Sequence, residues 1–182
     1  SIVFPEEHKS RLAVAYGRRM PDGTRAVRPF VDTKGITPAG NLSSSVEDLP
    51  HFASLQLRQG MSDGNQILKG RTLREMYRVQ WLEPDWKSGQ GLGFALERDG
   101  ERKLVGHGGS LAGYRTQITI SPEEKIAVIV LTNADDGNPE YYIKQSFNWV
   151  APAIKKATAP SPKVAPVDPD WGSCALLVIR IS

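Results

Sequence analysis

The segment His107-Gly108-Gly109-Ser110 combines the residue types in this sequence that are best suited to chemistry. Glycine weakens the pairing and packing of a strand, so two adjacent glycines typically mark a bulge, a bend or a place where a ligand lies against the backbone. The segment ends a strand-like stretch and is followed by Gly113 and Tyr114. It is a candidate binding or catalytic site, and a plain turn carrying a surface histidine is the alternative interpretation.

No nucleophile and base lie together in a way that would form an independent catalytic pair. His107 and Ser110 are three residues apart, and on a strand that spacing sends two side chains to opposite faces. A Ser-His pair is therefore not expected at this segment. His8 and His51 have no neighbouring nucleophile and are interpreted as surface residues.

Neither a metal site nor a cofactor is expected. The single Cys174 excludes an intrachain disulfide, and one cysteine with three scattered histidines offers almost no ligands for a structural zinc ion. The loop 133–138, with the sequence Asn-Ala-Asp-Asp-Gly-Asn, resembles a calcium-binding loop but lacks its distal bidentate glutamate. A turn followed by a helix cap is the preferred interpretation.

The composition is that of a folded protein. Of the 182 residues, 40% are hydrophobic and 24% are charged, which predicts one compact domain with a tail. No apolar run approaches about 18 residues, so no membrane span is expected. The formal net charge of +3 is too small and too interspersed to indicate nucleic-acid binding. The stretch Ser1–Pro5 shows no signal-peptide pattern, and the sequence does not predict the cellular compartment.

Two capping pairs predict the starts of helices. Ser45 and Asp48 precede apolar residues at helical spacing, which predicts a helix over residues 46–59. Thr72 and Glu75 form a second pair that predicts a short helix. The first forty residues are rich in glycine and proline and show no period, so they are expected to form a long excursion of turns.

A third helix is predicted after the cap Asn138 and the proline that follows it. Apolar residues then recur with helical spacing, so this helix should cover one face of a sheet. Pro152 is expected to break or kink the helix near its end.

The middle of the chain predicts an antiparallel meander. Leu92–Arg98 and Glu101–Gly106 flank Asp99-Gly100, a dipeptide suited to the two central positions of a tight hairpin. Tyr114–Ile120 alternates as a strand buried on one side, and Ile126–Thr132 is a continuous apolar run typical of a strand covered on both faces. The predicted fold class is α/β of the α+β type, an antiparallel meander flanked by helices.

The C-terminal end divides into a linker and a final strand. Residues 158–170 carry repeated prolines and are predicted to form an extended linker between a domain over residues 1–157 and the segment 171–182. The apolar run 175–181 is strand-like, and no second strand follows it.

The order of several short motifs resembles the C-terminal portion of the serine β-lactamase and penicillin-binding-protein-like family, which includes class C β-lactamases, D-alanyl-D-alanine carboxypeptidases and esterases. The matching motifs, in chain order, are Arg11-Leu12-Ala13, Ala15-Tyr16-Gly17, Pro38-Ala39-Gly40-Asn41-Leu42-Ser43-Ser44-Ser45, Glu47-Asp48-Leu49, Gln90-Gly91-Leu92-Gly93-Phe94, Gly106-His107-Gly108-Gly109, Gly113-Tyr114 and Val130-Leu131-Thr132-Asn133. The resemblance covers about residues 1–157 and implies a β-lactamase/transpeptidase-like fold. It suggests that residues 171–182 begin an accessory β-domain.

The resemblance implies a set of roles for the glycine-rich segment. His107-Gly108-Gly109 matches the family's third motif, which forms one wall of the active site, so Gly108 and Gly109 would lie against the substrate. His107 would attract a substrate carboxylate and assist proton movement. The backbone amide of Ser110 would stabilise the oxyanion of a tetrahedral intermediate, since a fixed amide donor needs no reorganisation.

Two motifs of that family do not occur in this chain. Its nucleophile lies in Ser-x-x-Lys and its proton relay in Tyr-x-Asn, and neither pattern is present. The chain is therefore expected to be the C-terminal part of a serine hydrolase that forms an acyl-enzyme, and to be inactive by itself. The alternative is a non-catalytic binding or interaction module that uses the same cleft wall.

The resemblance also suggests partners. The full-length protein would act on a small molecule or a peptide, namely a β-lactam, a D-amino-acid peptide or an ester. His107 stands where the third motif of β-lactamases has a lysine, and this difference favours the peptidase or esterase branch. Many family members are periplasmic or extracellular. In the family the strand 126–132 pairs with an N-terminal strand, so its far edge is expected here to be unpaired or matched by something else. An exposed edge of that kind would promote self-association.

Overall fold

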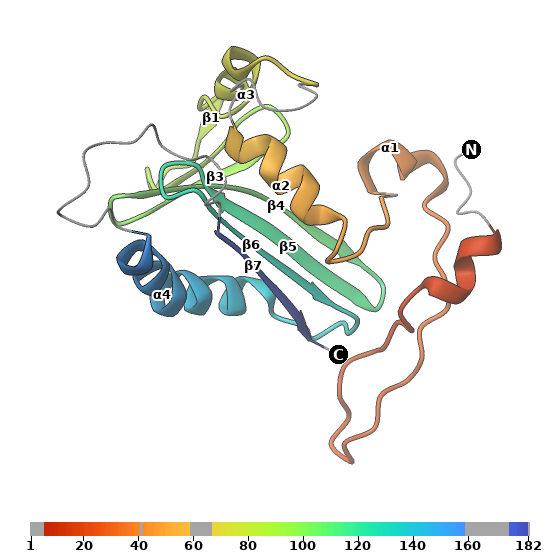
Figure 1. The fold of residues 1–182 in the computed structure, drawn as a ribbon. Helices are drawn as coiled ribbons and strands as arrows, with labels where there is room; N and C mark the ends of the chain where they lie inside the picture. Colours follow the sequence, from red (N-terminus) through yellow and green to blue (C-terminus); the bar gives the residue numbers. More distant parts are fainter. Residues whose placement is uncertain (1–5, 41, 59–66, 159–174, 182) are drawn as a thin grey trace.

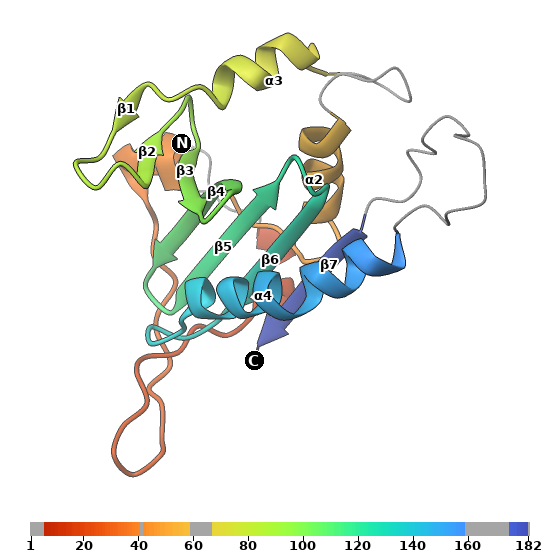
Figure 2. The same cartoon turned by 90° about the vertical axis from the view of Figure 1, so that its left-hand side faces the viewer.

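A computed structural model of the chain describes residues 6–40, 42–58, 67–158 and 175–181. Seven strands form one sheet in the order β1 to β7, so each strand lies beside its neighbour in sequence. Helix α2 (Leu49–Arg58) packs on one face of the sheet and helix α4 (Pro139–Ala157) on the other (Figures 1 and 2). The predicted α+β fold with an antiparallel meander flanked by helices is confirmed.

Strands β1 to β6 pair antiparallel, and β7 pairs parallel with β6. The strands are β1 (Trp81–Leu82), β2 (Ser88–Gln90), β3 (Ala95–Asp99), β4 (Arg102–Leu111), β5 (Tyr114–Ser121), β6 (Ile126–Thr132) and β7 (Ala175–Ile181). The remaining short elements are the 3-10 helices η1 (Glu6–Arg11) and η2 (Lys34–Ile36) and the α-helices α1 (Thr37–Gly40) and α3 (Gly70–Met76).

The hairpin between β3 and β4 is shifted by one residue from its predicted position. Asp99 pairs with Arg102, so the two loop residues are Gly100 and Glu101 rather than Asp99 and Gly100. Gly100 has a φ of 62°, and among the described residues of this loop it alone has a positive φ. One positive φ at the first loop position is the requirement of a type II′ turn, which explains why glycine stands there.

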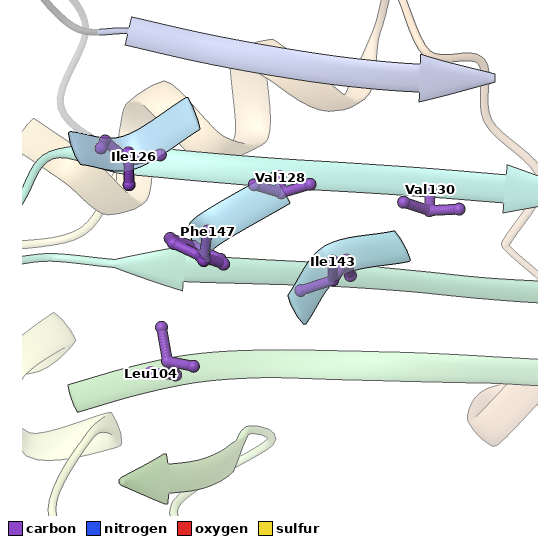
Figure 3. Packing of buried hydrophobic residues seen from close by; sticks show 7 residues of the cluster. Leu104, Ile126, Val128, Val130, Ile143 and Phe147 are labelled. Atoms are coloured by element: carbon purple, nitrogen blue, oxygen red, sulfur yellow. The ribbon is translucent and has the colours of Figure 1, made fainter. Parts of the chain in front are cut away.

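Strand β6 forms the centre of the core, as its continuous apolar sequence predicted. Ile126, Val128 and Val130 face α4, where they pack against Ile143 and Phe147 (Figure 3). The alternate residues of β6 face the opposite side, and Ala127 packs there beneath α2. Both faces of the strand are buried because a helix covers each of them.

The capping predictions for the first two helices were correct only in part. Ser45 Oγ accepts hydrogen bonds from the backbone N–H groups of Glu47 and Asp48, but these residues form a turn, and α2 begins at Leu49. Helix α3 begins after Lys69, which makes no side-chain cap. Thr72 therefore lies inside the helix, and its prediction as a cap was wrong.

Helix α4 begins as predicted, with Asn138 Oδ1 accepting a hydrogen bond of 3.1 Å from the backbone N–H of Tyr141. The expected break at Pro152 is absent, since the helix continues to Ala157. Proline removes one hydrogen bond to the carbonyl four residues earlier, at Asn148. Asn148 is exposed, so water can bind that carbonyl and the helix can continue.

Residues 13–28 form a long hairpin-like arm that extends away from the sheet (Figures 1 and 2). Its two sides are joined by a bridge between Tyr16 and Val27 and by a 2.8 Å bond from the Arg28 N–H to the Ala15 carbonyl. A second bridge joins Tyr16 to Ala134 after β6. The predicted excursion of turns is thus attached to the sheet at its base.

Strand β7 occupies the far edge of β6. All seven residues of β6, Ile126–Thr132, are in register with Ala175–Ile181. Residues 159–174, which include most of the predicted linker and Cys174, lie outside the described residues, and the division into two domains stays a prediction. Within the part of the chain that is described, no helix is long and apolar enough to cross a membrane.

Candidate active site at the open edge of strand β4

Strand β4 pairs with β3 along its first half and with β5 along its second half, and the two pairings overlap at Val105 and Gly106. Strand β3 pairs with residues Arg102–Gly106, whereas β5 pairs with Val105–Leu111. Within the part of the chain that the structure describes, the segment His107–Leu111 therefore has β5 on one side and an open edge on the other. The candidate site segment forms most of this edge.

The register shows which backbone groups point into the opening. Asp99 and Arg102 close a two-residue hairpin, and such a closing pair exchanges hydrogen bonds across the two strands. Because the pattern alternates, every second residue after Arg102 directs its N–H and C=O towards the β3 side. Gly108 and Ser110 follow this alternation beyond the end of β3. Their amides consequently point to the open edge, where no strand among the described residues pairs with them.

The side chains of His107 and Ser110 lie on opposite faces of the sheet. His107 is paired with Ile118 on the face covered by α2, and Ser110 is paired with Arg115 on the face covered by α4. This placement agrees with the expectation that the two residues do not form a Ser-His pair. His107 is exposed, and its Nδ1 lies 2.7 Å from the Gly108 carbonyl oxygen.

The two glycines of the segment lie within an unbroken strand, so the predicted strand end, bulge or bend is absent. A Cβ atom at Gly108 would lie 2.6 Å from Gln117 Oε1, and one at Gly109 would lie 2.4 Å from Thr116 Oγ1. Side chains of β5 thus occupy the space that a Cβ atom would need, which explains the glycines without a bend. Glycine at these positions lets β5 carry long polar side chains beside the open edge.

A pocket of about 360 Å³ lies beside the open edge. Its residues come from three places, namely β4, β5 and the loop that leads into α4. They are Gly108, Gly109, Ser110, Arg115, Thr116, Gln117, Gly137, Asn138, Pro139 and Glu140. Gly108 and Ser110, whose amides point to the open edge, are among the residues that line this pocket.

Both signs of charge line the pocket. Arg115 is half-buried, and its Nη1 donates a hydrogen bond of 3.1 Å to the carbonyl of Tyr114. This bond holds the guanidinium against the turn after β4. Glu140 lies in the first turn of α4. Ser110 contributes a backbone amide that is fixed by the strand, so the site can stabilise a developing negative charge on a carbonyl oxygen.

The site residues predicted from the sequence all lie on β4, and the prediction included none of the pocket residues from β5 or from the start of α4. Arg115 and Gln117 lie in the stretch Tyr114–Ile120, for which the sequence predicts only a strand buried on one side. The two-residue turn Ala112-Gly113 contains the missing signal, because it pairs Leu111 with Tyr114 and so places Arg115 opposite Ser110. The start of α4 is distant in sequence, and no local pattern links it to β4.

Comparisons with known proteins agree with this architecture. A penicillin-binding protein homologue from Pyrococcus abyssi, described as octameric, matches with 26% identity and a TM-score of 0.62, over 85% of this chain and 33% of that one. A D-stereospecific amidohydrolase from Streptomyces sp. matches with 20% identity and a TM-score of 0.51, over 74% of this chain and 38% of that one. No curated protein matches the sequence.

The chain thus spans 33% and 38% of the lengths of these two solved structures. The second likeness supports the fold alone, because so low an identity does not transfer chemistry. The family model described as Beta-lactamase matches residues 2–149, which include every element from η1 to the greater part of α4. The sheet, its open edge and this match lead to one conclusion: the chain belongs to the beta-lactamase family of serine hydrolases.

Proposed function

We propose that this chain supplies one wall and the oxyanion donor of a serine hydrolase that works through an acyl-enzyme. The observation that carries the proposal is the open edge of β4, where the Ser110 amide points beside a pocket of about 360 Å³. In this assignment Ser110 donates through its backbone, and Gly108 and Gly109 form the surface along which the substrate lies. His107 stands at the start of this surface.

The chemistry of acyl transfer explains why a strand edge suits this role. A nucleophile that attacks a carbonyl carbon converts the carbonyl oxygen into an oxyanion, and a donor already in place stabilises it. The Ser110 N–H is fixed by the pairing of its neighbours with β5. It therefore needs no rearrangement during the reaction.

The nucleophile and the proton relay must come from outside this chain. The sequence holds neither Ser-x-x-Lys nor Tyr-x-Asn, and we assign both to a preceding part of the same protein. The substrate is an acyl compound, namely a β-lactam, a D-amino-acid peptide or an ester. His107 in place of the lysine of β-lactamases favours a peptide or an ester.

The second candidate is a non-catalytic binding module, favoured by the absence of both motifs. An open strand edge can accept an extended peptide through backbone hydrogen bonds without any nucleophile. Both candidates predict that the isolated chain hydrolyses neither a chromogenic cephalosporin nor a p-nitrophenyl ester above the solvent rate. Turnover by the isolated chain that Ser110→Ala abolishes would contradict both.

The complete gene product separates the two candidates. Ser110→Pro removes the open amide N–H but leaves the β5 ladder bonds of its neighbours, because proline is tolerated at a strand edge that faces solvent. We expect kcat to fall by roughly 10²–10³, the usual cost of one oxyanion donor. Ser110→Ala keeps the amide and is the matched control, with kcat within about threefold of the parent. Equal activity of the two variants would refute the assignment.

A further inference from the structure

The loop between β6 and α4 carries two adjacent aspartates with different partners. Asp135 Oδ1 accepts a 2.7 Å hydrogen bond from the backbone N–H of Gly113, and Oδ2 accepts 2.9 and 2.8 Å bonds from Nε and Nη2 of Arg28. Asp136 accepts from Nη1 of Arg25 at 2.5 Å and from the Arg19 N–H at 3.1 Å. Both aspartates hold the arm, residues 13–28, but only Asp135 also holds the turn between β4 and β5.

That turn is closely packed against the arm. Gly113 has a φ of 79°, and a Cβ atom added to it would lie 2.4 Å from the Cβ of Ala15. The Tyr114 hydroxyl donates a 2.6 Å bond to the carbonyl of Ala13. The turn is therefore in direct backbone contact with the arm, and Asp135 joins turn, arm and loop in one place.

The position of this junction matters because the second half of β4 has a single neighbour. Between Gly106 and the turn, β4 pairs with β5 alone, whereas β5 also pairs with β6 on its other edge. This part of β4 is therefore the less supported of the two strands, and a contact at the turn limits its movement relative to β5. Ser110 lies directly before Leu111, the residue that closes the turn.

We propose that Asp135 is a positioning residue, which fixes the turn between β4 and β5 and thereby the direction of the Ser110 amide. This inference rests on the proposed function. Asp135 does not touch the pocket, so its effect on the reaction passes through Gly113 and the turn. The groups around Asp135 donate hydrogen bonds that favour an ionised carboxylate. The bond from the Gly113 N–H, and then the bond from Arg28, hold the pKa of Asp135 below its usual range.

The test compares two neighbouring variants in the complete gene product. Asp135→Ala removes the acceptor of the turn and of the arm, whereas Asp136→Ala removes an acceptor of the arm only. A displacement of about 1 Å can cost about 10²-fold in rate. We expect Asp135→Ala to lower kcat by about 10- to 100-fold with KM within about twofold, and Asp136→Ala to leave both constants within about twofold.

A conservative variant and a spectroscopic measurement keep the test decisive if Asp135→Ala folds poorly. Asp135→Asn retains an oxygen for the Gly113 N–H and should keep kcat within about fivefold of the parent. In proton–nitrogen spectra of the folded chain, Asp135→Ala should shift the Ser110 amide signal, and Asp136→Ala should not. Equal behaviour of the two alanine variants in kinetics and spectra would overturn the inference.

The Ser110→Pro variant, measured in the same series, separates this inference from the proposed function. If Ser110→Pro is as active as Ser110→Ala, the oxyanion assignment fails, and any effect of Asp135 on turnover has another cause. If Ser110→Pro loses activity while Asp135→Ala matches Asp136→Ala, the function stands and the positioning role is refuted.

Discussion

The two halves of strand β4 differ in almost every physical respect although they form one continuous element. The half Arg102–Gly106 pairs with β3 along its whole length and with β5 at Val105 and Gly106, and it contributes the buried Leu104 to the core beneath α4. The half His107–Leu111 has one neighbour, mostly exposed side chains and a pocket beside it. The first half stabilises the fold, and the second half presents backbone groups that the fold does not need.

Side-chain contacts of Arg102 fix the half Arg102–Gly106, which we call the covered half of β4. The Arg102 guanidinium lies 5.2 Å from the ring centre of Phe147, and Nε donates a hydrogen bond of 2.7 Å to Glu124 Oε2. These contacts join β4, the β5–β6 turn and α4. The open half can carry adjacent glycines because such contacts anchor the strand before it reaches the opening.

The largest expected effect tests the covered half. Leu104→Ala leaves a cavity beneath Phe147 and should lower the free energy of unfolding by about 2–5 kcal/mol. Thermal and urea unfolding of the chain measure this change, and Ser110→Ala in the open half is the control, with a change within about 0.5 kcal/mol. Similar losses for the two variants would show that the halves do not differ as described.

A second comparison uses glycines two residues apart on the same face. A Cβ at Gly106 would lie 2.4 Å from the backbone oxygen of Ile118, which cannot move without disturbing the ladder. A Cβ at Gly108 would meet the end of the Gln117 side chain, which can rotate. We expect Gly106→Ala to cost about 1–3 kcal/mol and Gly108→Ala less than about 1 kcal/mol in unfolding free energy. The reverse order would contradict the packing of β5 over β4.

A third prediction concerns amide hydrogen exchange along the open half. His107 and Gly109 donate towards β5 and should be protected, whereas Gly108 and Ser110 face the opening and should exchange at least about tenfold faster. The expected result is an alternation from one residue to the next. Uniform protection of the segment would mean that another part of the chain covers this edge.

The smallest expected effect is the response of the arm to acid. Hydrogen bonds from Arg25 and from the Arg19 N–H lower the pKa of Asp136 from 3.8 to about 2, and those from Gly113 and Arg28 lower that of Asp135. A carboxyl group whose pKa is lower in the folded state stabilises that state above its unfolded pKa. This contribution is lost as pH falls from about 4 towards 2.

The arm should therefore detach from the β6–α4 loop over that range of pH, before or together with the unfolding of the sheet. Chemical shifts of Tyr16 and Gly113, followed from pH 6 to pH 2, measure the detachment. Replacing both aspartates with asparagine should remove most of this pH dependence. A transition of unchanged size in that variant would assign it to other carboxylates.

The meander could be predicted from the sequence because its signals are local. Alternating apolar residues and short loops indicate which strands are neighbours, and the apolar run of β6 identifies the central strand. The cap Asn138 located the start of α4. Each of these features depends on residues that are close in the chain.

The features that sequence reasoning missed depend on contacts between distant residues. Gly108 and Gly109 favour a bend when considered alone, but the side chains of β5 determine that they lie within a strand. The junction at Asp135 joins residues from three separate parts of the chain. The pairing of β7 with β6 is parallel and non-local, and no pattern of the linker predicts it.

The order of the strands has a consequence for how the chain acquires its structure during synthesis. Each strand from β2 to β6 pairs with the strand synthesised just before it. The sheet can therefore form from its β1 edge while later residues are still being synthesised. Strand β7 must instead wait until α4 and the residues after it have been made. Until then no described strand of this chain pairs with that edge of β6, and at high ribosome density neighbouring nascent chains can pair there.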